Sequence, residues 1–309
     1  MTDSSTLPIT IRCHGVRGSI PSPGIETARY GGNTSCVELR CGNELLILDA
    51  GSGIRNLGNQ LMEQNGSRSI EGSLLISHTH WDHIQGLPFF VPGYSGQNRF
   101  SILAAPDYGA RVKIALTNQM TPLNFPVAFD QMRGVTGIKE LDPGINQVGC
   151  FAIRTVELNH PGGCAGFRIE THGIAIGYLP DHEPYNASQK TRRKKLAAFI
   201  RDLDLLLLDT QYTAQEYSQR ISWGHGSLPE SVRIAIAGNV RRLLLFHHDP
   251  THLDRQIDQM VEAARDLANG VSLSIDAAAE NQTIHLAPSK PGPIIPPTTF
   301  PFTATQITV

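Results

Sequence analysis

The feature that most constrains this chain is the run Ser-His-Thr-His-Trp-Asp-His at residues 77–83, which directly follows an apolar stretch at residues 74–76. Three imidazoles and a carboxylate lie close together, and each is costly to bury without compensation. Imidazole nitrogen suits zinc and similar cations, and a carboxylate can hold or bridge a harder cation. Two divalent ions would offset the burial of Asp82 and keep the histidines neutral. We therefore predict that this loop presents ligands to two metals.

Runs rich in β-branched and aliphatic residues alternate with segments at helical spacing, which predicts an α/β protein. We expect strands near residues 9–13, 36–40, 44–51, 72–77, 150–158, 165–181 (a hairpin), 204–210 and 242–250. We expect helices near residues 54–66, 188–201, 229–237 and 251–267. Residues 89–147 are rich in Pro, Gly and Gln and show no regular pattern, so they are a candidate lid over the site.

Four further apolar strands stop at a histidine or an aspartate. They end at His160 in LNHPGG, Asp181 in GYLPDH, Asp209 in LLLLDT, and the pair His247 and His248 in LLLFHHDP. The carboxyl ends of strands are where α/β sheets usually place their chemistry. A single histidine at a strand end is usually structural, but five such ends together support the metal interpretation.

Composition limits the class of protein. Charged residues make up 17% of the 309-residue chain and the net charge is −2, so a bulk electrostatic affinity for nucleic acid is not indicated. No apolar run approaches the roughly 20 residues needed to cross a bilayer, and the first residues do not resemble a secretory signal. The five cysteines are scattered, which favours reduced, buried thiols. We expect a cytoplasmic globular protein with no membrane partner.

Together with Asp49 in ILDAG, these motifs resemble the metallo-β-lactamase superfamily. The resemblance implies an αββα sandwich, in which two mixed β-sheets pack face to face between helices, with the metals at one edge. The predicted hydrolase domain covers residues 1–286. Residues 287–309 contain six prolines and are predicted to form a tail or arm.

The resemblance also implies a role for each ligand. In the family pattern, the first metal would be held by His78, His80 and His160. The second would be held by Asp82, His83 and His247, with Asp181 bridging the two ions. Aligning LFHHDP with the family's final strand favours His247 over His248, and Asp49 would support the histidine loop. The implied cofactors are two divalent ions, Zn²⁺ or alternatively Mn²⁺.

Two features indicate a branch of the family. His80 occupies a position where the diiron redox branch carries glutamate, which fits a hydrolytic site. The segment from Asp209 to His225, in WGHGS, resembles the ribonuclease Z and phosphodiesterase branch. An acid that orients an imidazole would let His225 donate a proton to a leaving alkoxide. The alternative is that His225 is a loop histidine without a catalytic role.

The spacing between two ligands bears on substrate size. Only 20 residues separate His160 from Asp181, enough for a hairpin but not for the long arm of tRNA-processing members. The basic cluster at residues 190–195 lies on a predicted helix and is interpreted as a solvated face. Arg17, Asn33 and Thr34, in a stretch resembling compact bacterial phosphodiesterases, would either line the mouth of the site or build turns.

The leading hypothesis is a dinuclear-metal phosphodiesterase that acts on a small phosphodiester such as a cyclic nucleotide. Its catalytic residues would be Asp82, Asp209 and His225. The alternatives are a lactone, thioester or β-lactam hydrolase, a tRNA 3′-processing endonuclease, and a non-catalytic protein that binds a phosphorylated ligand. A long nucleic acid partner is not expected, and a homodimer is a family-level expectation.

Overall fold

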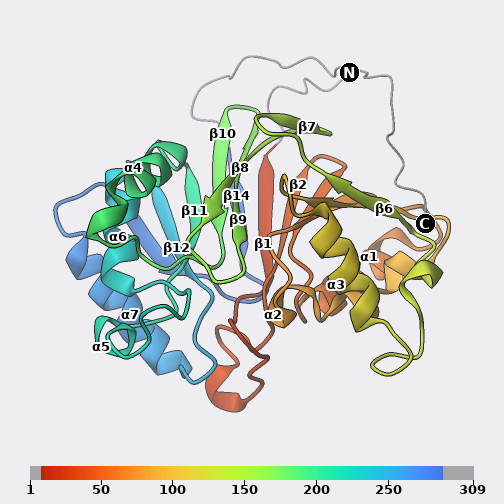
Figure 1. The fold of residues 1–309 in the computed structure, drawn as a ribbon, viewed down its shortest axis with the longest axis horizontal. Helices are drawn as coiled ribbons and strands as arrows, with labels where there is room; N and C mark the ends of the chain where they lie inside the picture. The colour runs from red at the N-terminus through yellow and green to blue at the C-terminus, as the bar shows by residue number, and fades with distance from the viewer. Residues whose placement is uncertain (1–7, 288–309) are drawn as a thin grey trace.

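The computed structural model describes residues 8–287 and has the predicted αββα sandwich architecture, with two mixed sheets between two layers of helices (Figure 1). The first sheet contains β1 (Ile9–Gly15), β2 (Cys36–Cys41), β3 (Glu44–Leu48), β4 (Glu71–Ile76), β5 (Arg99–Ala104), β6 (Val135–Glu140) and β14 (Thr283–Leu286). The second contains β7 (Asn146–Val148), β8 (Phe151–Leu158), β9 (Cys164–Thr171), β10 (Ile174–Leu179), β11 (Leu205–Asp209), β12 (Arg242–Phe246) and β13 (Ser274–Ala277). Their orders are β14-β1-β2-β3-β4-β5-β6 and β13-β12-β11-β10-β9-β8-β7.

Helices cover the outer face of each sheet (Figure 1). The α-helices are α1 (Ile54–Asn65), α2 (Trp81–Ile84), α3 (Gly109–Gln119), α4 (Lys190–Phe199), α5 (Ala214–Tyr217), α6 (Leu228–Ala237) and α7 (Asp254–Leu267). Short 3-10 helices lie at Ile25–Thr27, Leu87–Phe89, Val91–Tyr94, Phe129–Gln131 and Ala187–Gln189. No helix in the described part of the chain is long and apolar enough to span a membrane.

Apolar side chains fill three layers, one between the sheets and one beneath each set of helices. Strand β11 is buried at every position because the opposing sheet covers one face and helices cover the other. It pairs in parallel with β10 and β12. The carboxyl ends of these three strands therefore meet at one edge of the sandwich.

The segment 89–147 differs from the sequence expectation, because most of it builds the sandwich instead of a lid. Strands β5 and β6 extend the first sheet by parallel pairing, helix α3 packs outside them, and β7 forms the edge of the second sheet. The pattern was hard to see because β6 is an edge strand with exposed and half-buried positions throughout. The predicted tail covers residues 287–309, and residues 288–309 lie outside the described part of the chain.

The loop after β1 is anchored by the fully buried side chain of Arg17. Its Nε donates to the Gly31 carbonyl oxygen at 2.7 Å, and its Nη1 donates to the carbonyl oxygens of Asp249 (3.0 Å) and His252 (2.6 Å). The Asn33 side chain donates to the Glu280 carboxylate, and the Thr34 hydroxyl accepts from the Ser52 backbone N–H. These contacts favour the expectation that Arg17, Asn33 and Thr34 build turns over the expectation that they line the mouth of the site.

We predict that Arg17→Ala lowers the free energy of unfolding by about 3 kcal/mol or more, because three buried carbonyl oxygens lose a charged donor. Urea unfolding of both proteins would measure the difference. The exposed Arg55 offers a matched control, since Arg55→Ala should change stability by no more than about 0.5 kcal/mol. Equal stability of Arg17→Ala and the parent protein would contradict this anchoring role.

Candidate metal centre

The edge where strands of both sheets end brings together all nine side chains that the sequence singled out as metal ligands or catalytic residues. Those in the first half follow β4 and lie in the loop before α2 or within it. The others follow β8, β10 and β12 or, in the case of Asp209, end β11, except for His225, which precedes α6. The nine are His78, His80, Asp82, His83, His160, Asp181, Asp209, His225 and His247.

Asp49, which follows β3, organises the histidine loop. Its carboxylate is fully buried and accepts hydrogen bonds from the Ser77 backbone N–H at 2.7 Å and the Ser77 hydroxyl at 2.8 Å. It also accepts from His83 Nδ1 and from the Tyr178 hydroxyl, both at 2.8 Å. Because its Nδ1 faces Asp49, the His83 ring directs Nε2 towards the centre of the site. The contacts are those of a supporting residue and not of a ligand.

A first cluster joins His78, His80, His160 and Asp181. Each offers one ligand atom, and these atoms lie within 4.8 Å of one another. His160 Nε2 is 3.0 Å from His80 Nδ1, and both His160 Nε2 and His78 Nε2 are 3.6 Å from Asp181 Oδ2. The orientation of His160 is fixed by a hydrogen bond from its Nδ1 to the Gly224 carbonyl oxygen at 2.9 Å.

A second cluster joins Asp82, His83 and His247. His83 Nε2 and His247 Nε2 are 3.3 Å apart, and they lie 3.3 Å and 3.1 Å from Asp82 Oδ2. The other oxygen of Asp181, Oδ1, lies 3.0 Å from His83 Nε2 and 3.4 Å from His247 Nε2. The two oxygens of Asp181 therefore face different clusters, an arrangement that suits a carboxylate bridging through both oxygens.

The donor atoms fit divalent cations. Zinc–nitrogen bonds of about 2.0–2.1 Å place tetrahedral ligands roughly 3.3 Å apart, close to the spacing of several donor pairs described above. His78 Nε2 is buried and has no hydrogen-bond partner among residues 8–287. The outward nitrogens of His83, His160 and His247 are occupied by Asp49, Gly224 and Gln211, so their inward nitrogens remain available.

The electrostatics of the site are also those of a cation site. Burial and the neighbouring His83 imidazole lower the pKa of His78 well below its ordinary value. Burial would raise the pKa of Asp181, but the imidazoles of His247 and His83 outweigh it and lower that pKa well below its ordinary value. Burial likewise opposes protonation of His83, but Asp181 and Asp82 raise its pKa well above the ordinary value. The carboxylates that favour a proton on His83 would equally favour a bound cation in its place.

Asp209 and His225 form a pair beside the two clusters. His225 Nδ1 donates to Asp209 Oδ2 at 3.1 Å, and Asp209 is fully buried. Burial would lower the pKa of His225, but the hydrogen bond to Asp209 outweighs it and raises the pKa to about 9. His225 Nδ1 also lies 3.8 Å from Asp181 Oδ2. The Asp209 carboxylate therefore favours the protonated form of this imidazole, which lies next to the clusters.

The structure distinguishes the two histidines after β12. His247 has a positive φ of 60° and directs Nε2 into the second cluster. His248 instead donates from Nε2 to the Ala278 carbonyl oxygen at 2.9 Å, and burial lowers its pKa to about 3. His248 therefore faces the protein interior, and His247 is the histidine placed to bind a cation.

Two neighbours of the site were not identified from the sequence. A Cβ added to Gly18 would lie 2.4 Å from two atoms of the His247 ring, and the Ser19 backbone N–H donates to Asp82 Oδ2 at 2.7 Å. Both residues belong to the motif GVRGS, which is visible in the sequence. Nothing in the sequence, however, indicates that this motif contacts Asp82 and His247, some 60 and 230 positions further along the chain.

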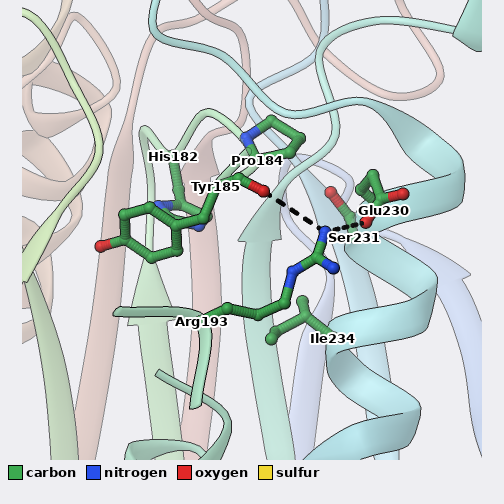
Figure 2. A pocket seen from close by; sticks show the side chains of 7 residues that line it. All are labelled: His182, Pro184, Tyr185, Arg193, Glu230, Ser231 and Ile234. Atoms are coloured by element: carbon green, nitrogen blue, oxygen red, sulfur yellow. Dashed lines mark hydrogen bonds and ion pairs between the residues drawn. The ribbon is translucent and has the colours of Figure 1, made fainter. Parts of the chain in front are cut away.

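Glu183 is another residue that the sequence did not identify. Its carboxylate accepts from the backbone N–H groups of Ser222 (2.6 Å) and Gly224 (3.0 Å), which fixes the loop whose carbonyl orients His160. The preceding residue, His182, contributes to a small pocket beside the site (Figure 2). Burial lowers the pKa of His182 to about 4, and its Nδ1 accepts from the Asn159 backbone N–H.

The same pocket bears on the basic cluster of α4. Arg193 donates to Glu230 at 3.0 Å and to the Tyr185 carbonyl oxygen at 3.3 Å (Figure 2). Because it is held by these partners, the Arg193 guanidinium is occupied by contacts within the protein. The arrangement agrees with a structural and solvated face and gives no support to a phosphate track.

A sandwich with a His/Asp centre at one edge defines a class of metal-dependent hydrolases. A family model described as "Beta-lactamase superfamily domain" matches residues 45–248. Since this match covers more than half of the chain, the protein belongs to the beta-lactamase superfamily and is a metal-dependent hydrolase.

Individual relatives agree with this assignment. The chain is 24% identical over 243 residues to ribonuclease Z of Lactiplantibacillus plantarum, covering 66% of this chain and 77% of the relative. The metallo-beta-lactamase fold protein YhfI from Bacillus subtilis has a TM-score of 0.68 and 19% identity, covering 90% of this chain and 99% of that one. Unliganded yeast PDE1 has a TM-score of 0.67 and 15% identity, with coverages of 91% and 100%.

We predict that Gly18→Ala lowers metal occupancy and reduces hydrolysis by roughly 10–100-fold, because the added methyl group displaces the His247 ring. Metal analysis and turnover of any accepted substrate would measure both effects. Gly96→Ala is the matched control, since its Cβ would meet nothing closer than 3.7 Å. Full metal occupancy and activity in Gly18→Ala would show that His247 does not need this position.

Proposed function

We propose that this protein is a dinuclear-metal phosphodiesterase that acts on a small phosphodiester such as a cyclic nucleotide. The observation that carries the proposal is the hydrogen bond from His225 to the buried Asp209, beside the two clusters. A phosphodiester with an alkoxide leaving group needs a proton donor at that group. His225, as an imidazolium, provides one.

Metal binding is assigned to the two clusters. His78, His80 and His160 would hold one ion, Asp82, His83 and His247 the other, and Asp181 would bridge them, as the oxygen positions of Asp181 support. Two bound divalent ions, which we propose to be Zn²⁺, would lower the pKa of a water molecule towards neutrality and neutralise charge on the phosphate oxygens. Mn²⁺ is the alternative metal.

The chain's own residues carry the remaining steps. The Ser19 backbone N–H and Asp49 hold the Asp82 and His83 side chains in place. Asp209 orients the His225 ring through Nδ1, which leaves Nε2 to deliver a proton to the leaving oxygen. Asp82 would also be a catalytic residue in this proposal, because it would hold the second ion, which would supply charge stabilisation to the phosphate.

Two observations favour a small substrate. The segment between His160 and Asp181 is a compact hairpin of β9 and β10, joined by a turn at His172 and Gly173, and it carries no extended arm. Trp81 directly follows His80 in the chain and Trp223 directly precedes Gly224, and these two residues are 79% and 60% exposed. Exposed indole rings are suited to stacking on a nucleobase, which agrees with a nucleotide substrate.

Similarity to ribonuclease Z proteins supports a second candidate, a tRNA 3′-processing endonuclease. The compact hairpin and the net charge of −2 favour the small substrate over it. We further propose that residues 1–286 form the hydrolase domain. The cytoplasmic location and the homodimer stay predictions.

We predict that metal-loaded protein hydrolyses bis-p-nitrophenyl phosphate and cyclic nucleotides faster than lactones, thioesters or β-lactams, and leaves precursor tRNA uncleaved. His80→Ala should lower diester turnover by about 100-fold, because the first cluster loses a ligand. The exposed His285 gives the control, and His285→Ala should keep full activity. Unchanged turnover in His80→Ala would reject the metal mechanism, and faster ester or lactam turnover would reject the substrate class.

A separate prediction concerns the proton donor. His225→Ala should reduce turnover of a cyclic nucleotide by about 10²–10⁴-fold, but turnover of bis-p-nitrophenyl phosphate far less, because p-nitrophenolate leaves without protonation. Metal content is measured alongside, since His225 also lies near Asp181 and His247. An equal loss for both substrates with a loss of metal would instead identify His225 as a ligand.

A further inference from the structure

A second group of metal-binding side chains lies at the opposite end of the sandwich from the active site. Cys41 ends β2, Cys150 directly precedes β8, and His172 lies in the turn between β9 and β10. The proposed ligands His160 and Asp181 follow the other ends of β8 and β10. Because these strands contain eight and six residues at about 3.3 Å each, the two groups are roughly 20 Å apart or more.

The three side chains come from different sheets and converge. The two Sγ atoms and one ring nitrogen of His172 all lie within 4.8 Å of one another. Cys41 belongs to the first sheet and is only 3% exposed, whereas Cys150 and His172 belong to the second sheet and are half-buried. The Thr171 hydroxyl, 4.0 Å from Cys41 Sγ, is a further contact across the sheets.

A carboxylate lies next to this group. Glu44 is the first residue of β3, and its Oε2 lies against Gly149, where an added Cβ would be only 2.3 Å away. Gly149 has a positive φ of 56°, so the turn before Cys150 both requires glycine and leaves the space that the Glu44 carboxylate fills. Glu44 is exposed, and its carboxylate lies outside the 4.8 Å spacing that the two thiols and the imidazole share, so it neighbours the group through Gly149.

We propose that Cys41, Cys150 and His172 form an additional site for a thiophilic divalent cation of the Zn²⁺ class, with the fourth position open to water or to the neighbouring Glu44 carboxylate. Thiolate and imidazole donors together select such a cation. Zinc–sulfur bonds of about 2.3 Å place tetrahedral sulfur ligands roughly 3.8 Å apart, so the donors need to close by only about 1 Å. The bound ion would clamp the two sheets together far from the chemistry.

Binding of a cation at this site would release protons from the two thiols. Burial, together with the nearby Cys41 thiol, raises the pKa of Cys150 to about 12, so this thiol is protonated when no cation is present. Formation of two metal–thiolate bonds releases one proton from each thiol, and His172 binds as the neutral imidazole. No change of oxidation state is involved.

The test uses the full-length protein, reduced, stripped of metal and reloaded with Co²⁺. A thiolate ligand gives a charge-transfer band in the near-ultraviolet, which the proposed catalytic ligands, all nitrogen or oxygen donors, do not produce. We expect this band in the parent protein. We expect it to be lost in Cys150→Ser and in His172→Asn, and zinc content to fall by about one equivalent per chain in each.

The variants are chosen so that folding and catalysis are preserved. His172 has a positive φ of 46°, which asparagine adopts readily, so His172→Asn removes the ligand but keeps the turn. His285→Asn, at an exposed histidine of β14, is the matched control and should keep both band and zinc. Diester turnover should be unchanged in all three variants, which separates this site from the proposed function.

Several outcomes would overturn the proposal. They are the absence of a charge-transfer band in the reduced parent protein, a band that persists in Cys150→Ser and His172→Asn, and equal zinc contents in parent and variants. A Cys41–Cys150 disulfide that resists reductant in the purified protein, detected by mass spectrometry, would also overturn it, because the thiolates would then not exist.

Discussion

The buried carboxylate of Asp49 is the contact on which the geometry of the candidate metal centre depends. It binds the start of the histidine loop through Ser77, the ring of His83, and the hydroxyl of Tyr178 in β10. Asp49 and Ser77 follow strands of the first sheet, whereas Tyr178 belongs to the second. One side chain therefore sets both the direction of an imidazole and the alignment of the two sheets at this edge.

Asp181 depends on this alignment. It follows β10, two residues beyond the end of the strand that carries Tyr178, and its two oxygens face different groups of imidazoles. Parallel pairing of β10, β11 and β12 then brings Asp209 and His247 to the same edge. The site therefore depends on how these strands are aligned, because each of the three residues lies at the carboxyl end of a buried apolar strand. Loops such as Ser222–Gly224, held by Glu183, add the remaining orientation.

Sequence reasoning could predict what is local or lies at the end of an apolar strand. The run at residues 77–83, the aspartate after β10 and the aspartate that ends β11 belong to this class, and the sandwich fold followed from them by resemblance. Contacts between distant segments could not be predicted. Gly18 gives no sign that it lies against His247, and the scattered cysteines did not indicate that Cys41 and Cys150 meet across the sheets. The edge strand β6 was missed because half-buried positions obscure its alternation.

Two residues at the active-site edge, Asp49 and His247, adopt left-handed backbone conformations with φ of 58° and 60°. Such conformations cost a non-glycine residue of order 1–3 kcal/mol, so the surrounding contacts must enforce them. Glycine would relieve the strain but would remove the carboxylate or the imidazole. At Asp49 this strain is smaller than the cost of its removal, because glycine would leave four buried donors without an acceptor. The strained backbone is therefore retained by the contacts of the side chain that it presents.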